Sequence, residues 1–358
     1  MAGIPMFKAS PAELKKKPAT GTELGFGKIL TDYMFLMDYQ HGEGWKNPRI
    51  EPYRPLAVDP AALVLHYGQE VFEGLKAYRW PNGEIYLFRP RMNYERMNRS
   101  AKRVCMPALD VEFALEATRQ LIQLEKEWVP STPGTSLYIR PNMIAVEAAL
   151  GVQLSKKYLF YIILAPVGAY YPQGFNPVDI YVCEKYIRAA RGGLGEAKTM
   201  ANYAASLLAA EEAHELGYTQ VLWLDAIERK YAEEVGTSNI FFYIGDELIT
   251  PSLDGTILPG ITRDSVLHIA RHWELKVTER KISLEEVIGA LESGSLKEIF
   301  ASGTAAVISP VGKLAYRGKT FLVNGGKVGP LAQKLYDFIV GIQYGKMKDP
   351  YGWMERVA

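Results

Sequence analysis

The chain has 358 residues, and at about 100 to 200 residues per domain this length favours two domains, each large enough to bury a core. Hydrophobic residues make up 48% and charged residues 23%, which is typical of globular proteins and too apolar for a disordered chain. Lys and Arg number 41 against 40 acidic residues, a formal net charge of +1. The basic excess of a nucleic-acid-binding protein is missing, so we expect no nucleic-acid partner.

The two cysteines, Cys105 and Cys183, lie far apart with no CxxC motif or Cys/His cluster nearby. We therefore expect no metal site and no disulfide framework, and a reducing cytoplasm fits best. Residues 1–18 lack the apolar region of a secretory signal. The longest uncharged stretch, residues 158–178, is interrupted by three prolines, so we expect no membrane span.

The first half of the chain carries signals of both strands and helices. Asn82 and Gly83 separate two runs with alternating apolar residues, which predicts a β-hairpin with a type I′ turn. Helical periodicity in residues 91–104 and 110–129 and a strand-like run in residues 136–146 follow. We expect an α+β domain.

A loop rich in Pro, Gly, Asn and Tyr marks the domain boundary. It follows directly on the apolar, strand-like run of residues 158–165. We predict a small α/β domain at residues 1–167, an interdomain loop at 168–178 and a large domain at 179–358.

The second half also mixes helices and strands, and we expect a largely antiparallel sheet. A helix is predicted over residues 200–216, and Gly217 stands where a left-handed residue would end it. The other predicted elements are strands at 178–184, 221–224, 240–244, 247–250 and 297–301 and helices at 258–273 and 284–292.

Residues 192–199, GGLGEAKT, differ from a phosphate-binding P-loop in having alanine before the lysine. A P-loop also follows directly on a buried strand, whereas a basic stretch separates the strand predicted at 178–184 from Gly192. A nucleotide-binding P-loop protein therefore stays as an alternative from another functional class.

Lys198 remains as a lysine on a glycine-rich loop before a helix that carries Tyr203. A lone lysine is usually a solvated surface charge. A lysine that attacks carbonyls, however, usually acts with an aldehyde cofactor, so we test pyridoxal phosphate as a hypothesis. This cofactor needs a carboxylate at its ring nitrogen, for which Glu233 and Glu234 are candidates, and a phosphate site.

Two small-residue turns could supply that phosphate site. Gly260, Ile261 and Thr262 open a predicted helix, whose free N–H groups suit an anion. Residues 302–305 form the second turn, and Arg96 could add a positive charge. Each turn alone is more often an ordinary cap or loop.

Seven longer runs form a specific set: HYGQEVFEGLKAYR, FRPRMNYERMNRSAKRVCMP, TSLYIRP, GGLGEAKTMANYAASLLAAEEAHELGYTQVLWLD, EEVGTSNIFF, ILPGITRDSVL and GSLKEIFASGTAAVISPV. In this order they resemble the branched-chain amino-acid aminotransferases over more than nine-tenths of the chain. The resemblance implies a fold type IV pyridoxal-phosphate enzyme of the D-amino-acid-aminotransferase-like architecture. Its two α/β domains would have mostly antiparallel sheets with flanking helices. It would form a homodimer with an active site roofed by the partner subunit.

The same resemblance assigns roles to individual residues, with Lys198 as the internal-aldimine lysine and catalytic base. The implied cofactor contacts are Tyr203 at the ring oxygen, Glu234 at the pyridine nitrogen, and Arg96, Ile261, Thr262 and Thr304 at the phosphate. The implied carboxylate-binding groups of the substrate site are Thr237 and Ala305. The implied side-chain pocket consists of Tyr67, Phe72, Tyr138, Arg140 and Tyr170, with Leu150 and Val152 reaching in from the partner.

The implied reaction is the reversible, ping-pong transfer of the amino group of L-leucine, L-isoleucine or L-valine to 2-oxoglutarate, giving L-glutamate. Glutamate must use the same apolar pocket, and Arg140 is a candidate polar handle for it. A D-amino-acid aminotransferase and an aminodeoxychorismate lyase, of the same fold, remain alternatives. Mammalian members carry a CxxC pair after the Gly-Thr-Ala turn, whereas residues 306–309 read AVIS, so we expect no thiol switch.

Overall fold

The computed structural model describes residues 3–168 and 174–357, which fall into two compact units. Unit 1 comprises Met1–Tyr170, Ala197–Met200 and Gly341–Ala358, and unit 2 comprises Tyr171–Glu196 and Ala201–Val340. The domain limits stay a prediction, and residues 169–173 of the predicted interdomain loop lie outside the described part. Two segments that follow the predicted interdomain loop in the sequence belong to unit 1, and the first of them, Ala197–Met200, carries Lys198.

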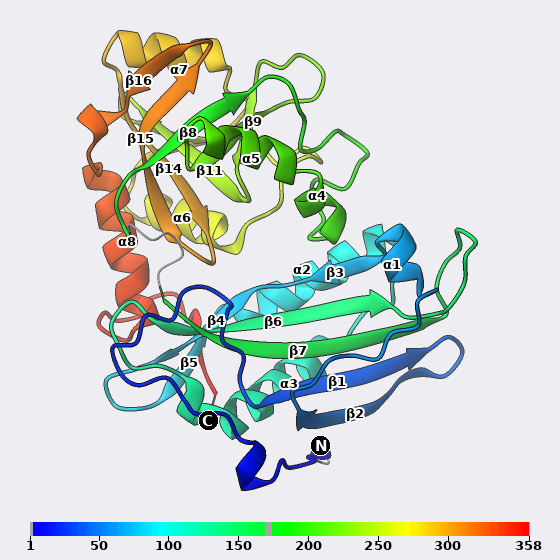
Figure 1. Cartoon of the computed structure of the whole chain (residues 1–358). Coiled ribbons are helices and arrows are strands. Elements are labelled where there is room, and N and C mark those ends of the chain that lie inside the picture. Colours follow the sequence, from blue (N-terminus) through cyan, green and yellow to red (C-terminus); the bar gives the residue numbers. More distant parts are fainter. Residues whose placement is uncertain (1–2, 169–173, 358) are drawn as a thin grey trace. The chain divides into compact units, whose positions relative to one another are not determined.

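Unit 1 is built on an eight-stranded sheet (Figure 1). The strand order is β17-β5-β4-β6-β7-β1-β2, with β3 paired to β6, and the described pairs are all antiparallel. The strands are β1 (Tyr33–Gln40), β2 (Gly44–Pro52), β3 (Glu70–Phe72), β4 (Leu75–Arg79), β5 (Ile85–Phe88), β6 (Ser136–Ala145), β7 (Lys157–Val167) and β17 (Met354–Arg356).

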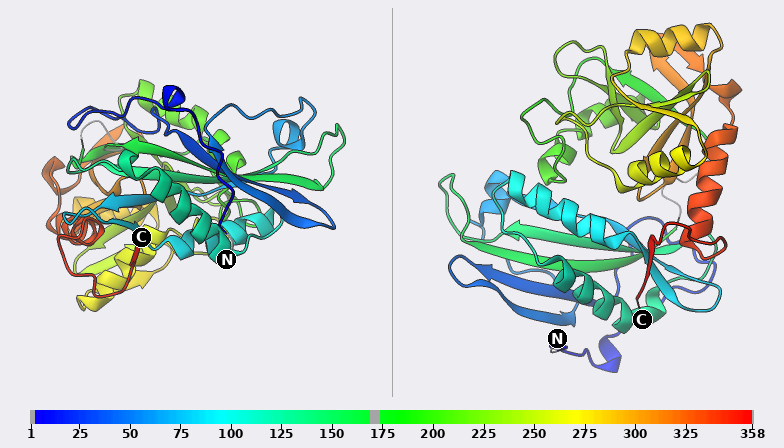
Figure 2. Two further views of the ribbon diagram at one scale, coloured as in Figure 1. Left: turned by 90° about the horizontal axis from the view of Figure 1, so that it is seen from below. Right: turned by 180° about the vertical axis from the view of Figure 1, so that it is seen from behind.

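Two long helices cover one face of this sheet, α2 (Pro90–Arg103) and α3 (Val111–Leu124) (Figure 2). Asp110 caps α3, because its carboxylate accepts hydrogen bonds from the first-turn amides of Glu112 and Phe113. The α3 stripe of Ala114, Leu115, Ala117, Leu121 and Ile122 is buried in the core. The shorter helices of the unit are α1 (Leu63–Tyr67), η1 (Pro11–Glu13) and η2 (Lys126–Trp128).

The predicted hairpin is confirmed, but its turn type is wrong. Strands β4 and β5 pair with Arg79 opposite Ile85, and Gly83 N donates to Trp80 O. The turn therefore centres on Pro81 and Asn82. A type I′ turn needs a positive φ at both central residues. Pro81 and Asn82 do not have one, and the positive φ of 86° belongs to Gly83, which follows them. Pro81 fixes a negative φ at the first central position, so the left-handed conformation occurs at Gly83, two residues later.

Unit 2 is built on a nine-stranded sheet in the order β10-β9-β8-β15-β14-β11-β12-β13, with β16 paired to β15. Because β10 also pairs with β11, six of these strands close into a ring. The pairs are antiparallel except for β8 with β9 and β15, and β12 with β13. The strands are β8 (Val178–Cys183), β9 (Gln220–Leu224), β10 (Ala232–Val235), β11 (Ser238–Ile244), β12 (Glu247–Thr250), β13 (Lys276–Glu279), β14 (Leu296–Gly303), β15 (Val307–Tyr316) and β16 (Lys319–Leu322).

Helices α6 (Ile261–His272) and α7 (Leu284–Glu292) begin and end close to their predicted limits. Leu284 and Val287 of α7 belong to the same buried core cluster as Ile240 and Phe242 of β11. The other helices after residue 173 are α4 (Met200–Ala204), α5 (Leu207–Glu215), η3 (Asn324–Gly326) and α8 (Pro330–Gln343).

The single helix predicted over residues 200–216 is wrong, because it is two helices, α4 and α5. Ser206 explains the break. Both its amide and its hydroxyl donate to Tyr203 O, a local three-residue closure that competes with the α-helical pattern. The predicted left-handed residue after the helix is confirmed, since Gly217 has a φ of 85° and follows Leu216, the C-cap residue of α5.

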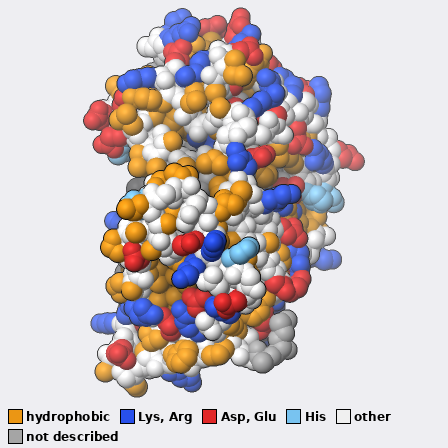
Figure 3. Space-filling model, turned by 90° about the vertical axis from the view of Figure 1, so that its right-hand side faces the viewer, with side chains coloured by type: hydrophobic (Ala, Val, Ile, Leu, Met, Phe, Trp, Pro, Cys, Tyr) orange, Lys and Arg blue, Asp and Glu red, His pale blue; other side chains and the backbone are white. Residues whose placement is uncertain are grey.

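The surface carries mixed charges. In Figure 3 the basic and acidic side chains lie interspersed over the face drawn, in keeping with the near-neutral net charge. Across residues 3–168 and 174–357, no helix has both the length and the apolar character needed to span a bilayer.

Candidate active site

In unit 1, the backbone of Lys198 is held by the sheet and by α2. Lys198 N donates to Ser100 Oγ of α2 at 2.9 Å, and Phe72 N donates to Lys198 O at 3.1 Å. Its neighbours are fixed as well, since Thr199 Oγ1 donates to Glu70 O and Met200 N to Glu70 Oε2. The half-buried lysine side chain lies over Phe72, with Nζ 4.7 Å from the ring centroid.

Arg96, the predicted phosphate contact, is buried in an ion pair with Glu73. Nε and Nη2 of the guanidinium lie 2.7 and 2.9 Å from the two carboxylate oxygens. Burial alone would raise the pKa of Glu73, but the charge and hydrogen bonds of Arg96, together with Lys198, lower it. Glu73 was not predicted as a site residue, because charged residues are usually exposed and only the structure reveals its burial.

The predicted pocket residues Phe72, Tyr138 and Arg140 lie together in unit 1. The Arg140 guanidinium lies 4.6 Å from the centre of the Phe72 ring, and its Nη2 donates to Tyr138 Oη at 3.0 Å. Arg140 Nε is buried and has no hydrogen-bond partner among the described residues. A buried guanidinium donor without a partner suits an anionic ligand group.

The remaining pocket residues lie at the surface or outside the described part. Tyr67 is 42% exposed and donates its hydroxyl hydrogen to Leu150 O. Leu150 and Val152 are 72% and 83% exposed, so their apolar side chains are uncovered in this single chain. Tyr170 lies outside the described residues.

The predicted residues of unit 2 gather at one end of its sheet. Thr237 lies in the two-residue turn between β10 and β11, and Thr304 and Ala305 lie in the turn between β14 and β15. Asn239 pairs with Ser302 across β11 and β14, so both turns lie at the same edge. Tyr203, also in unit 2, is half-buried on α4.

Two neighbouring acids of β10 have different partners. Glu234 is buried, forms an ion pair with Arg188 Nη2 at 2.8 Å and accepts a hydrogen bond from Asn239 Nδ2 at 2.9 Å. Glu233 accepts instead from Thr256 Oγ1 at 2.7 Å. Arg188 and Asn239 as partners of Glu234 were missed at the sequence level, where Arg188 was only part of a basic stretch.

The start of α6 lies beside Asn239. The N-cap residue is Gly260, which has no side chain that could cap the helix, and Ile261 and Thr262 form its buried first turn. A Cβ at residue 260 would lie 2.0 Å from Asn239 Oδ1, so this close approach requires glycine. The backbone amides at such a helix start suit an anion.

These side chains provide the donor and acceptor set that pyridoxal phosphate requires. Unit 1 carries the amine of Lys198 and the buried guanidinium of Arg96, and unit 2 carries the carboxylate of Glu234 and the helix start at Gly260. The described residues contain no cluster of three or more His, Cys, Asp or Glu side chains that could hold a metal ion. The P-loop alternative lacks its context, since β8 ends at Cys183, well before the glycine-rich run.

Comparison with known proteins agrees with this set. Residues 70–314 match the model of the amino-transferase class IV family. The chain is 55% identical over 344 residues to branched-chain-amino-acid transaminase 1 of Bacillus subtilis (strain 168), covering 96% of each chain. It is 48% identical to the branched-chain-amino-acid aminotransferase of Mycolicibacterium smegmatis, covering 93% of this chain and 92% of that one.

Solved structures of branched-chain amino acid aminotransferases resemble this fold. The branched-chain amino acid aminotransferase of Escherichia coli has a TM-score of 0.76 at 28% identity, covering 91% of this chain and 99% of that one. The enzyme of Thermobaculum terrenum in its PLP form has a TM-score of 0.73 at 26% identity, covering 91% and 98%. The chain belongs to the class IV aminotransferase family, and the predicted fold class is confirmed.

Proposed function

We propose that this chain is a pyridoxal-phosphate enzyme that transfers the amino group of L-leucine, L-isoleucine or L-valine to 2-oxoglutarate. The observation that carries this proposal is its high identity to named branched-chain transaminases over nearly the full length of both chains. The donor set of Lys198, Arg96 and Glu234 supports it. A D-amino-acid aminotransferase or a lyase of the same fold has no comparable support.

We assign the central chemistry to two residues. Bound pyridoxal phosphate supplies a ring that takes up the electrons released when the substrate loses its Cα proton. Lys198 would act as the base that takes this proton and returns it on the cofactor side. Glu234 would accept a hydrogen bond from the ring nitrogen and keep it protonated, with Arg188 and Asn239 holding the carboxylate in place.

The other assigned residues would bind the phosphate and the substrate. Arg96, Ile261, Thr262 and Thr304 would hold the phosphate, Tyr203 the ring oxygen, and Thr237 and Ala305 the substrate carboxylate. An apolar side chain would lie against Phe72, Tyr67, Tyr138 and Tyr170. Arg140, with its unpartnered Nε, would receive the second carboxylate of glutamate or 2-oxoglutarate. Such a pocket discriminates only weakly among the three branched side chains.

We also propose that the enzyme is a cytoplasmic homodimer. The exposed side chains of Leu150 and Val152 support an interface, because apolar groups this uncovered gain free energy when a partner buries them. The two free thiols, Cys105 and Cys183, are in keeping with a reducing compartment.

Absorbance spectroscopy of the purified protein tests the proposal. We expect a violet-range band that bleaches with L-leucine and returns with 2-oxoglutarate, but does not respond to D-leucine. Lys198→Ala should abolish this cycle, whereas Lys346→Ala, which removes an exposed lysine, should retain it. Protein that stays colourless after incubation with pyridoxal phosphate would refute the proposed function, and cycling with D-leucine would favour the D-amino-acid alternative.

A further inference from the structure

Glu73 is a fully buried acid whose oxygens are surrounded by hydrogen-bond donors. Besides Arg96, Asn93 Nδ2 donates to its Oε2 at 2.8 Å and Gly74 N donates at 3.1 Å. Asn93 also donates to Gly74 O at 3.1 Å, which ties α2 to the connection between β3 and β4. A carboxylate with this many donors is held in one orientation.

That connection leaves little freedom to the backbone. Glu73 N donates to Pro141 O at 2.8 Å, and a Cβ at residue 74 would lie 2.0 Å from Tyr138 Oη. Any other residue at position 74 would have to displace Tyr138 or the strand. Contacts of both the backbone and the side chain therefore fix the position of the Glu73 carboxylate.

The contact with Arg96 fixes a guanidinium in the same way. Its Nε and Nη2 engage both carboxylate oxygens, so the plane of the guanidinium is determined as well as its place. Arg96 stands one helical turn before Ser100, which accepts the hydrogen bond from Lys198 N. One face of α2 thus carries the predicted phosphate ligand and an anchor of the predicted catalytic lysine.

The charges in this cluster favour an anionic ligand. Arg96 and Lys198 act on the carboxylate of Glu73, and Lys198 and Arg140 act on that of Glu70, so three cations face two acids. Removing a buried carboxylate leaves its buried cation without a counter-charge, and such a cation reorients or draws in water. The orientation of Arg96 thus depends on Glu73.

We propose that Glu73 is a positioning residue for cofactor binding, which orients the Arg96 guanidinium toward the phosphate group of pyridoxal phosphate. This inference rests on the proposed function. It predicts that Glu73 matters for the phosphorylated cofactor and much less for pyridoxal, which lacks the phosphate. A purely structural role would weaken the binding of both molecules alike.

The test compares dissociation constants of the cofactor-free protein for pyridoxal phosphate and for pyridoxal, measured by absorbance titration. Glu73→Gln should weaken pyridoxal phosphate binding about 10- to 100-fold, as for the loss of a charged hydrogen bond, and change pyridoxal binding less than about threefold. Arg96→Gln should give a similar loss, and the double variant should be no weaker than either single one. Glu298→Gln is the matched control, because this buried acid accepts from Leu331 N and Ala332 N of α8 in unit 2.

The control should lower thermal stability while leaving the ratio of the two constants unchanged. An unchanged ratio in Glu73→Gln, or additive losses in the double variant, would overturn the inference. If Glu73→Gln does not fold, Asn93→Ala removes one donor from the same carboxylate, and it should shift the ratio in the same direction by a smaller factor. Wild-type protein that binds no pyridoxal phosphate would refute the proposed function itself, whereas normal wild-type binding with an unchanged ratio refutes only the role of Glu73.

Discussion

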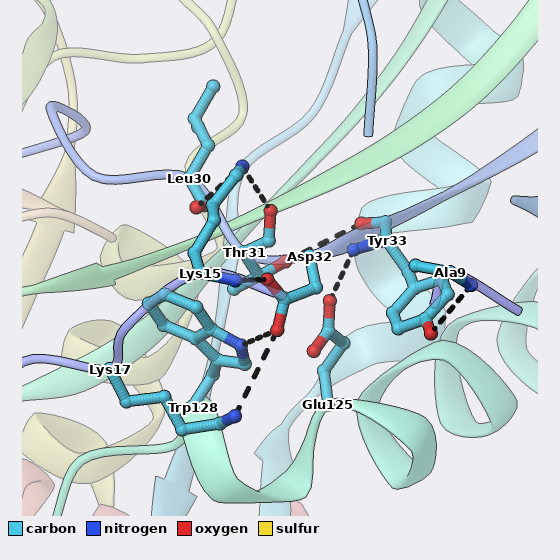
Figure 4. A network of polar contacts seen from close by, with 9 residues as sticks. All are labelled: Ala9, Lys15, Lys17, Leu30, Thr31, Asp32, Tyr33, Glu125 and Trp128. Atoms are coloured by element: carbon cyan, nitrogen blue, oxygen red, sulfur yellow. Dashed lines mark hydrogen bonds and ion pairs between the residues drawn. The ribbon is translucent and has the colours of Figure 1, made fainter. Parts of the chain in front are cut away.

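Glu125 is a buried acid beside a second acid, and it should make the stability of unit 1 depend on pH. Figure 4 shows the surrounding network, in which Lys15 N and Trp128 Nε1 donate to Asp32 at 2.8 Å each and Lys17 Nζ lies 3.9 Å from it. Glu125 Oε1 accepts a hydrogen bond from Tyr33 N at 2.5 Å. Burial raises the pKa of Glu125 to about 7, against the opposing effect of hydrogen bonds, and the Asp32 charge adds to the rise.

The free energy involved follows from the two pKa values. A pKa of about 7 in the folded chain against an ordinary 4.5 corresponds to about 3 kcal/mol. Because the folded chain holds this proton more tightly than the unfolded chain, stability falls as the pH rises through that window. About 2.5 kcal/mol of the loss should develop between pH 5 and pH 8.

Urea unfolding followed by circular dichroism at several pH values measures this effect. Glu125→Gln keeps an acceptor for Tyr33 N but cannot ionise. Between pH 5 and pH 8 the free energy of unfolding of this variant should therefore fall by about 2.5 kcal/mol less than that of the wild type. Glu127→Gln, which removes an exposed acid in η2 just after Glu125, should follow the wild type. Parallel pH profiles for the wild type and Glu125→Gln would show that the reasoning about Glu125 is wrong.

Three further predictions concern the proposed active site. Glu234→Gln should lower kcat about 10- to 100-fold in steady-state assays with L-leucine, while Glu233→Gln, its strand neighbour, should change kcat less than about threefold; equal losses would contradict the assignment of the ring acid. Arg140→Met should raise KM for 2-oxoglutarate about 10- to 100-fold and KM for L-leucine far less, and a parallel rise would mean that Arg140 does not serve the second carboxylate. Gly260→Ala should cost about 1 to 3 kcal/mol in urea unfolding, because its Cβ would press on Asn239 Oδ1, and unchanged stability would mean that the loop relaxes freely.

Local signals in the sequence predicted many of the elements after residue 75, whereas helix α8 and strands β10, β13, β15, β16 and β17 were not predicted. Helix α7 and strand β12 have the predicted limits, because their periodicity and flanking turns are local features. The errors arose where one residue altered the backbone: Pro81 changed the turn of the hairpin, and Ser206 split a helix whose composition favours continuity. The early strands β1 and β2 carry no turn signal as strong as Asn-Gly and were not predicted.

In the candidate site, the residues that would contact the cofactor could be predicted from the sequence, but the residues that contact them could not. The family resemblance assigns roles to Lys198, Arg96 and Glu234, but it did not point to the residues that contact them. Glu73 lies 23 residues from Arg96, and Arg188 lies 46 residues before Glu234. Such pairs form only when the sheet and helices assemble, and a buried acid and an exposed one look alike in a sequence.

The two acids of β10 show how the assembled sheet distinguishes residues that the sequence could not. Successive side chains on a strand point to opposite faces, and the two acids make different direct contacts: Glu233 with Thr256, and Glu234 with Arg188 and Asn239. Glu234 lies across the ladder from Asn239, whose amide also donates to Leu258 O and whose oxygen lies against Gly260. A chain of direct contacts therefore runs from Glu234 to the start of α6. An acid linked in this way to an anion-binding helix start is suited to contact the ring nitrogen of a cofactor whose phosphate binds at that helix start, which favours Glu234 over Glu233.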